Sequence, residues 1–283
     1  MPDTAARPFG SLLTAMVTPM KDDGSVDVKA AAALAVHLVA NGHDGLVLNG
    51  TTGEAPTTHT PEKAELIRAV VDAVGDRAVI LSGAGSNDTR HAVRMAEQAA
   101  EAGAHGLLVV TPYYSRPSQR GVYQHTVAVA DATELPVMLY DVPGRTAVRY
   151  APDTLDRLAE HPRIVAIKDA TGDVQSALRG IERTGLAWYS GDDGLLLPFL
   201  SVGAVGLVSM AAHLVGNELA RVITEFERGD VAAARATFLS VAPVVDLICG
   251  SGNGALRSKL TLALLGLIPS AAMRSPQVEA DEY

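Results

Sequence analysis

The sequence predicts an α/β fold, a (β/α)8 TIM barrel with a C-terminal helical extension. Short β-rich runs alternate with amphipathic helical stretches along most of the chain. Most of these runs are continuously apolar, which is typical of strands buried on both faces of a parallel sheet. Eight such units follow one another without a long linker, and this favours a closed barrel over an open sheet.

The expected strands are eight runs of four to six residues. They lie at 12–17, 45–48, 78–82, 106–110, 136–140, 164–168, 187–190 and 205–209. The expected helices between them lie at 28–40, 61–74, 89–102, 119–130, 152–160, 174–182 and 194–202. Pro61 and Pro152, each next to an acidic residue, mark the first turns of two of these helices.

The chain beyond the eighth unit has helical periodicity and no strand pattern. Helices are expected at 221–226, 232–241 and 256–265, with Gly229-Asp230 at a junction. We therefore divide the chain into a barrel with the active site at residues 1–229 and a helical appendix at residues 230–283.

Composition excludes several classes of protein. A chain of 283 residues with 48% apolar and 19% charged residues can bury a large core without disulfides or a structural metal. A formal net charge of −9 argues against a nucleic-acid partner, which would need a basic surface. A single cysteine, Cys249, excludes an internal disulfide, and its apolar surroundings indicate a small buried hydrophobic residue.

Neither a targeting signal nor a membrane segment is expected. Residues 1–10 hold no apolar core, and the apolar run at 12–17 is too short for a secretion signal, so we expect a cytoplasmic protein. The uncharged segment 194–212 is long enough to span a membrane. It carries Pro198, Gly203 and Gly206, and we interpret it as a short helix, a turn and a buried strand.

Motifs for nucleotides and metals are weak. The run 83–88 has Asp88 where a dinucleotide fingerprint needs its third glycine, and Gly50-Thr51-Thr52-Gly53-Glu54 lacks the lysine of a P-loop. The histidines are scattered without ligand spacing, so we expect no metal and no cofactor.

Two reactive side chains end neighbouring strands, where active sites of barrels lie. Lys168 ends the sixth apolar run, and a sheltered amine can condense with a carbonyl group. Tyr140 holds the same position on the fifth run and could relay protons to that amine. The alternatives are a Lys168 that faces solvent or pairs with Asp169, and a Tyr140 that only packs.

Three loops add polar groups to the same end of the barrel. The turn around Thr51 and Thr52 offers hydroxyl and N–H groups to an anion, although an ordinary capping turn would look similar. Arg145 follows a Pro-Gly pair, and a guanidinium there suits a carboxylate unless it is merely solvated. Tyr113 and Tyr114 follow the fourth strand and indicate a subunit contact or simple packing. Together these groups fit an imine-forming enzyme for an anionic keto acid.

Five segments carry a resemblance to a known family. They are Gly50-Thr51-Thr52-Gly53-Glu54, Thr111-Pro112-Tyr113-Tyr114, Tyr140-Asp141-Val142-Pro143-Gly144-Arg145, Ile167-Lys168-Asp169-Ala170-Thr171-Gly172 and Ser190-Gly191-Asp192-Asp193. From about residue 12 to the eighth strand, the sequence resembles the dihydrodipicolinate (4-hydroxy-tetrahydrodipicolinate) synthase family of pyruvate-dependent Schiff-base aldolases.

The resemblance implies a role for each matching residue. Lys168 would form an imine with pyruvate, while Thr51, Tyr140 and a Tyr114 from a neighbouring subunit would relay protons. Thr52 would hold the pyruvate carboxylate, the Val208 carbonyl would line the pocket, and Arg145 would receive the carboxylate of aspartate semialdehyde. The product would be the precursor of lysine and diaminopimelate, and the enzyme would be a homo-oligomer, usually a dimer of dimers.

The sequence also departs from that family. Asp141 stands where many relatives carry Asn, and the region matching the lysine-feedback cleft has Ala55, Thr60, Lys63 and His91. Because an acid to grip the amino group of lysine is missing there, we expect weak or absent inhibition by lysine. Residues 256–283 match poorly, and a final helix of the family is expected to be missing.

Two other functions remain open from the sequence. A sibling aldolase, like N-acetylneuraminate lyase or a ketodeoxygluconate aldolase, would use the same Lys168 with a sugar-derived keto acid, and Arg145 argues against it. A barrel that only senses a keto acid would not need Lys168, Tyr140 and Thr51 together.

Overall fold

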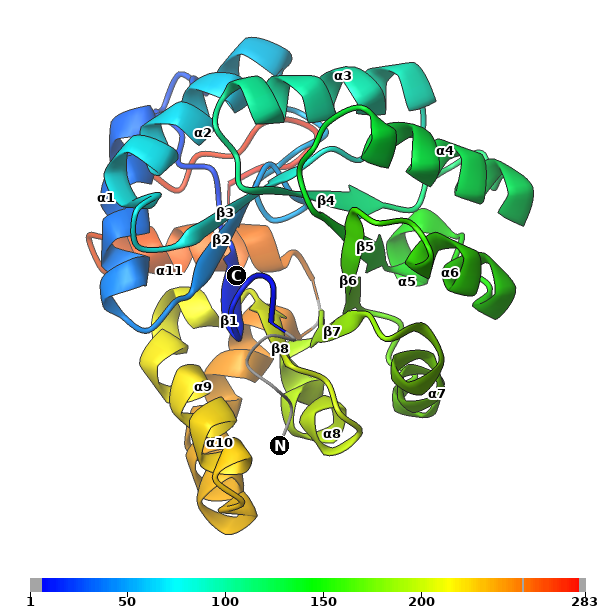
Figure 1. The fold of residues 1–283 in the computed structure, drawn as a ribbon. Coiled ribbons are helices and arrows are strands. Elements are labelled where there is room, and N and C mark those ends of the chain that lie inside the picture. Colours follow the sequence, from blue (N-terminus) through cyan, green and yellow to red (C-terminus); the bar gives the residue numbers. More distant parts are fainter. Residues whose placement is uncertain (1–6, 251, 280–283) are drawn as a thin grey trace.

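A closed barrel of eight parallel strands forms the centre of the computed structural model, which describes residues 7–250 and 252–279. Each strand pairs with its neighbour in the sequence, and the last pairs with the first (Figure 1). The strands are β1 (Leu12–Ala15), β2 (Gly45–Leu48), β3 (Val79–Gly83), β4 (Gly106–Val110), β5 (Val137–Asp141), β6 (Ile164–Asp169), β7 (Ala187–Ser190) and β8 (Gly206–Ser209). The predicted (β/α)8 barrel is therefore confirmed.

Helices surround the barrel and continue beyond it. They are α1 (Val28–Ala40), α2 (Thr60–Val74), α3 (Thr89–Glu101), α4 (Gln119–Asp131), α5 (Pro143–Thr146), α6 (Pro152–Ala159), α7 (Val174–Thr184), the 3₁₀ turn η2 (Asp193–Leu195), α8 (Leu196–Ser201), α9 (Ala212–Glu227), α10 (Val231–Cys249) and α11 (Gly254–Leu264). The segment 194–212 forms the end of η2, α8 and β8, as interpreted from the sequence.

Two apolar layers explain why the strands are continuously apolar. One layer lies between the strands and the surrounding helices and includes Leu46, Leu139 and Ile167. The other fills the barrel interior and includes Leu13, Met138 and Val208. Successive strand residues alternate between these layers, so both faces of each strand are buried.

The first strand is shorter than predicted. Met16 and Val17 are buried and apolar, which makes them look like strand residues in the sequence. The N–H group of Val17, however, donates to Nε2 of His213 at 3.1 Å and not to a neighbouring strand. The apolar pattern therefore predicted the burial of Met16 and Val17 correctly but placed the end of the first strand too late.

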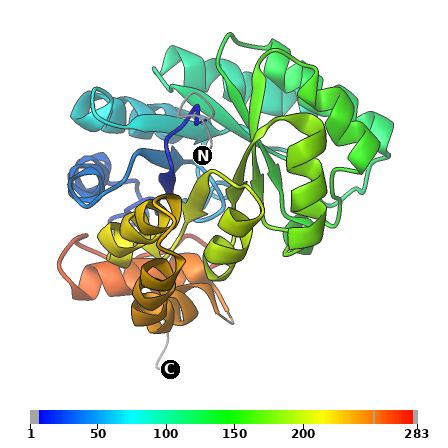
Figure 2. The same ribbon diagram turned by 60° about the horizontal axis from the view of Figure 1, so that its bottom comes forward.

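The C-terminal helices lie together on one side of the barrel (Figures 1 and 2). Helix α10 packs mainly against α9 and continues through Pro243, where the sequence analysis had ended a helix. Among the described residues, α10 alone is long and apolar enough to cross a membrane, a property that it shares with core helices of globular proteins. Helix α11 contacts the loop that follows β2 through Lys259, which forms an ion pair with Glu54.

Candidate active site

A cavity of about 190 Å³ opens at the carboxyl ends of the strands. Five predicted site residues contribute to its wall: Thr51, Thr52, Tyr140, Arg145 and Lys168. They come from loops or strand ends that are far apart in the sequence. The barrel brings them together because the carboxyl ends of its parallel strands meet on one face.

Lys168 and Tyr140 lie side by side in this cavity. They are directly opposite each other on β6 and β5, and a bulge near the start of the two strands sets this register. Lys168 Nζ lies 4.5 Å from the centroid of the Tyr140 ring. The residues are 5% and 7% exposed, so the amine is sheltered from bulk water, as the sequence predicted.

Within the part of the chain that the structure describes, Lys168 has no carboxylate partner that would occupy its amine. None of the ion pairs among residues 7–250 and 252–279 includes it. Asp169 accepts hydrogen bonds from Thr171 N at 2.8 Å and Trp188 Nε1 at 3.0 Å instead. A Cβ at Gly191 would lie 3.0 Å from Lys168 Cγ, so a glycine leaves room for this side chain.

The turn after β2 presents an anion-binding surface. Thr52 is buried and Thr51 is exposed, and both line the cavity. Among the described residues, neither of their N–H groups donates to another protein group. Thr18 Oγ1 fixes the turn from below through the carbonyl of Gly53 at 2.7 Å. The turn therefore offers hydroxyl and N–H donors to a carboxylate.

The remaining predicted residues lie at different places. Arg145 is exposed on α5, a short helix that the sequence analysis did not predict, at the rim of the cavity. Tyr114 is 87% exposed and does not line the cavity of its own chain. Val208 is buried in the barrel interior and does not line the cavity either; Met210, just beyond β8, does so.

Several cavity residues were not predicted as site residues. Cys249, Asn253 and Ala255 come from the C-terminal segment, which the sequence analysis had treated as an appendix without chemistry. Cys249 packs against the apolar cluster of Ala211, Val245 and Ile248, as expected of a small hydrophobic residue, but it is only partly buried and also borders the cavity. Burial raises the pKa of its thiol.

Asp193 is another cavity residue that was not predicted, and its side chain accepts hydrogen bonds from three groups. Its carboxylate accepts hydrogen bonds from Ser209 Oγ, from Met210 N at 3.2 Å and from Ala211 N at 3.0 Å. It thereby fixes the loop after β8, which forms part of the cavity wall.

A second cavity, of about 440 Å³, adjoins the first and shares Thr51, Tyr140 and Arg145 with it. Its wall includes Lys63, His59 and His91, and no described residue of the wall carries a carboxylate. The amine of Lys63 donates to the carbonyls of Ala55 at 2.8 Å and Thr58 at 2.6 Å. Burial lowers the pKa of this amine to about 8.

A pair of buried carboxyl groups lies directly beyond the Tyr140–Lys168 pair. Asp141 and Asp169 are opposite each other on β5 and β6. Asp141 Oδ2 accepts from Tyr150 N at 3.3 Å, whereas its Oδ1 has no hydrogen-bond partner among the described residues. Burial and the neighbouring Asp169 raise the pKa of Asp141 to about 7. Asp141 therefore shifts from mainly protonated to mainly ionised near neutral pH.

Replacing Asp141 by asparagine is expected to stabilise the protein at alkaline pH. Between pH 3.8 and about 7 the unfolded chain ionises while folded Asp141 keeps its proton, so stability falls as pH rises. A shift of this size corresponds to at most about 4 kcal/mol above pH 7. Thermal unfolding at pH 5 and pH 8 would show a smaller pH-dependent loss in Asp141→Asn. The exposed Asp76→Asn variant is the control, and equal losses in Asp141→Asn and wild type would contradict the assignment.

Within the described part of the chain, no group of three or more His, Cys, Asp or Glu residues could hold a metal ion.

Comparisons with known proteins identify relatives of this chain. Residues 8–283 match the family model of the dihydrodipicolinate synthetase family. The 4-hydroxy-tetrahydrodipicolinate synthase of Bifidobacterium longum is 54% identical over 97% of this chain and 90% of its own length. Because the family match extends to residue 283, the expectation that residues 256–283 match poorly was wrong.

Solved structures of the same kind superpose closely. A dihydrodipicolinate synthase from Bacillus anthracis is 41% identical, with a TM-score of 0.92, and the match covers 97% of this chain and 94% of that one. The dihydrodipicolinate synthase from Acinetobacter baumannii, crystallised with pyruvate, is 37% identical with a TM-score of 0.91 over 97% and 94% of the two chains.

Proposed function

The chain belongs to the dihydrodipicolinate synthetase family, and we propose that it condenses pyruvate with aspartate 4-semialdehyde to give 4-hydroxy-tetrahydrodipicolinate. It is a lyase that forms a Schiff base, and its product leads to lysine and diaminopimelate. The observation that carries this assignment is the sheltered Lys168 amine, 4.5 Å from the Tyr140 ring and beside the Thr51–Thr52 turn.

Lys168 is proposed to begin the reaction as a nucleophile. Its Nζ attacks the keto carbon of pyruvate, and loss of water gives an iminium ion. The iminium draws electrons from the methyl group, which loses a proton and becomes the nucleophilic carbon of an enamine. This carbon attacks the aldehyde of the semialdehyde, forming the new C–C bond. The amino group of the product chain then attacks the iminium carbon, closes the ring and releases Lys168.

The neighbouring groups are proposed to move protons and bind carboxylates. Tyr140, Thr51 and Tyr114 of the partner subunit carry protons to and from the carbinolamine. Thr52 and the N–H groups of its turn hold the pyruvate carboxylate. Val208, which does not line the cavity, is given no role in this proposal. Arg145 receives the semialdehyde carboxylate at the rim, where a guanidinium can form two parallel hydrogen bonds.

Tyr114 supports an oligomer, which we propose is a dimer of dimers in the cytoplasm. Its side chain is 87% exposed, and its φ of 75° is unusual for a bulky residue. Arg116 in the same loop also has a positive φ, of 48°. Such strained backbone often holds a side chain for function, here toward the site of a neighbouring subunit.

Borohydride trapping tests the proposed chemistry. Reduction in the presence of pyruvate is expected to leave a stable adduct on Lys168, found by peptide mass spectrometry. A parallel assay compares aspartate semialdehyde with N-acetylneuraminate and ketodeoxy sugar acids as second substrates. No adduct, or an adduct elsewhere, would overturn the assignment, and preference for a sugar acid would support the sibling aldolase.

We also propose that the chain divides into a barrel at residues 1–229 and a helical appendix at residues 230–283.

Lysine is expected to inhibit the enzyme weakly or not at all. The described wall of the larger cavity offers one amine, one guanidinium and two imidazoles but no carboxylate for the ammonium groups of lysine. Lys63, which already donates to two carbonyls, would repel those groups. A steady-state assay with increasing lysine measures the effect. Half-inhibition at or below about 1 mM, which needs about 4 kcal/mol of binding energy, would contradict this expectation.

A further inference from the structure

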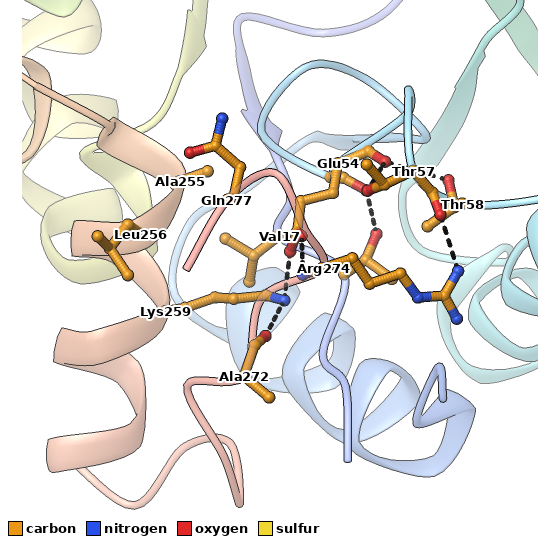
Figure 3. A network of polar contacts seen from close by, with 12 residues as sticks. Val17, Glu54, Thr57, Thr58, Ala255, Leu256, Lys259, Ala272, Arg274 and Gln277 are labelled. Atoms are coloured by element: carbon orange, nitrogen blue, oxygen red, sulfur yellow. Dashed lines mark hydrogen bonds and ion pairs between the residues drawn. The ribbon is translucent and has the colours of Figure 1, made fainter. Parts of the chain in front are cut away.

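We propose that Lys259 and Arg274 are positioning residues for the condensation. Both residues lie in the C-terminal segment (Figure 3). They hold the turn with Thr51 and Thr52 in the conformation that binds the pyruvate carboxylate. This inference rests on the proposed function and extends it to residues that do not line the cavity around Lys168.

Glu54 is the last residue of the Gly50–Glu54 turn. Its backbone has a φ of 57°, and its N–H donates to the carbonyl of Thr51 at 3.1 Å. The carboxylate does not line either cavity and is buried, with the whole residue 4% exposed. The conformation of the turn therefore depends on what binds this carboxylate.

Lys259 binds one oxygen of Glu54. Its Nζ comes from α11 and donates to Glu54 Oε1 and to the carbonyl of Ala272 at 2.7 Å (Figure 3). The lysine is 0% exposed. A buried ammonium and a buried carboxylate each need the other, because either one left alone would be desolvated without compensation. The turn and α11 are therefore expected to keep their relative position during catalysis.

Arg274 supplies one further connection to the turn and one to the residues that follow it. Its backbone N–H donates to Glu54 Oε2 at 2.9 Å, and its Nη1 donates to the carbonyl of Thr57 at 2.9 Å. The guanidinium also pairs with Glu62 in the first turn of α2 and binds the carbonyl of Gly24 at 2.8 Å. One side chain thus links the residues after the turn to the helix that follows them.

The same C-terminal segment forms another wall of the cavity. Asn253 and Ala255 lie at the start of α11 and line the cavity around Lys168. A movement of α11 would shift this wall and, through Lys259 and Glu54, the opposite anion-binding turn. Small displacements of binding groups can lower rates about 100-fold, so this connection is expected to affect catalysis as well as stability.

Steady-state kinetics of Lys259→Met and Glu54→Gln test the proposal. Each variant leaves a buried charge or dipole without its partner, and each is expected to raise KM for pyruvate about 10- to 100-fold, with a smaller change in kcat. The double variant, in which neither residue is charged, is expected to recover most of the loss. Arg183→Met removes an exposed ion pair with Asp156 and is the control with unchanged kinetics.

Thermal unfolding of every variant separates positioning from stability alone. If Lys259→Met does not fold, Arg274→Met provides the second test, because its side chain is only partly buried and the backbone bond to Glu54 remains. We expect this variant to raise KM for pyruvate about 3- to 10-fold. The proposal would be overturned if the variants unfold at lower temperature but keep the wild-type KM for pyruvate. It would also be overturned if the double variant has a KM for pyruvate no lower than that of the single variants.

The wild-type protein separates this inference from the proposed function. A wild type that gives no pyruvate adduct with borohydride would overturn the function itself. If the wild type does give the adduct, its rate of formation and the pyruvate concentration that it needs are compared with those of Lys259→Met and Arg274→Met. Equal values in all three proteins would overturn the positioning role alone.

Discussion

Replacing Lys168 by alanine is expected to abolish both the condensation and the borohydride-trapped pyruvate adduct. The variant has no amine to form the imine, so the electron sink that makes the methyl group of pyruvate acidic is lost. We expect kcat to fall by at least about 1000-fold, which corresponds to roughly 4 kcal/mol in the activation barrier. The coupled semialdehyde assay and intact-protein mass spectrometry measure the two losses.

Lys29→Ala is the matched control, since this lysine is exposed on α1 and lies outside both cavities. It is expected to keep full activity and the adduct. Lys168→Ala should remain folded, because among the described residues removal of this amine leaves no carboxylate without its ion-pair partner. A Lys168→Ala protein that still forms one adduct would place the imine on another amine.

The sequence was sufficient to predict the barrel and the Lys168–Tyr140 pair. Both features depend on local patterns: continuous apolar runs indicate buried strands, and a polar residue at the end of such a run indicates the active face. The two side chains hold equivalent positions on consecutive runs. A bulge in the structure sets their exact register, and the sequence alone does not show it.

The C-terminal part of the site could not be predicted in the same way. Lys259 meets Glu54 across 205 positions of the sequence, and no periodic pattern links the two residues. Cys249 and Asn253 reach the cavity only because α10 and α11 pack beside the barrel. Such contacts follow from tertiary packing, which a pattern of apolar residues does not specify.

Buried charge explains why these long-range contacts matter for function. Lys259 and Glu54 compensate each other, whereas Asp141 accepts a single, long hydrogen bond from the described residues and has a pKa raised to about 7. The pair therefore favours a single arrangement of the turn. Asp141 is instead expected to make the stability of the protein depend on pH.

Replacing Arg145 by alanine is expected to separate the two half-reactions. Arg145 lies at the rim of the cavity, whereas Lys168 and Tyr140 are buried within it. Loss of hydrogen bonds to a charged carboxylate costs about 1.5–3 kcal/mol, so kcat/KM for the semialdehyde is expected to fall roughly 10- to 150-fold. The pyruvate adduct, which does not involve the guanidinium, is expected to form within about twofold of the wild-type rate.

Two further variants identify what Arg145 contributes. Arg145→Lys keeps the charge but cannot form two parallel hydrogen bonds, so it is expected to recover only part of the semialdehyde activity. Arg179→Ala removes an exposed arginine of α7 outside both cavities and is expected to behave like the wild type. Equal losses of adduct formation and semialdehyde use in Arg145→Ala would show that the guanidinium acts on the pyruvate step. Arg145 would then no longer explain why the enzyme takes an aldehyde with a carboxylate in preference to a sugar acid.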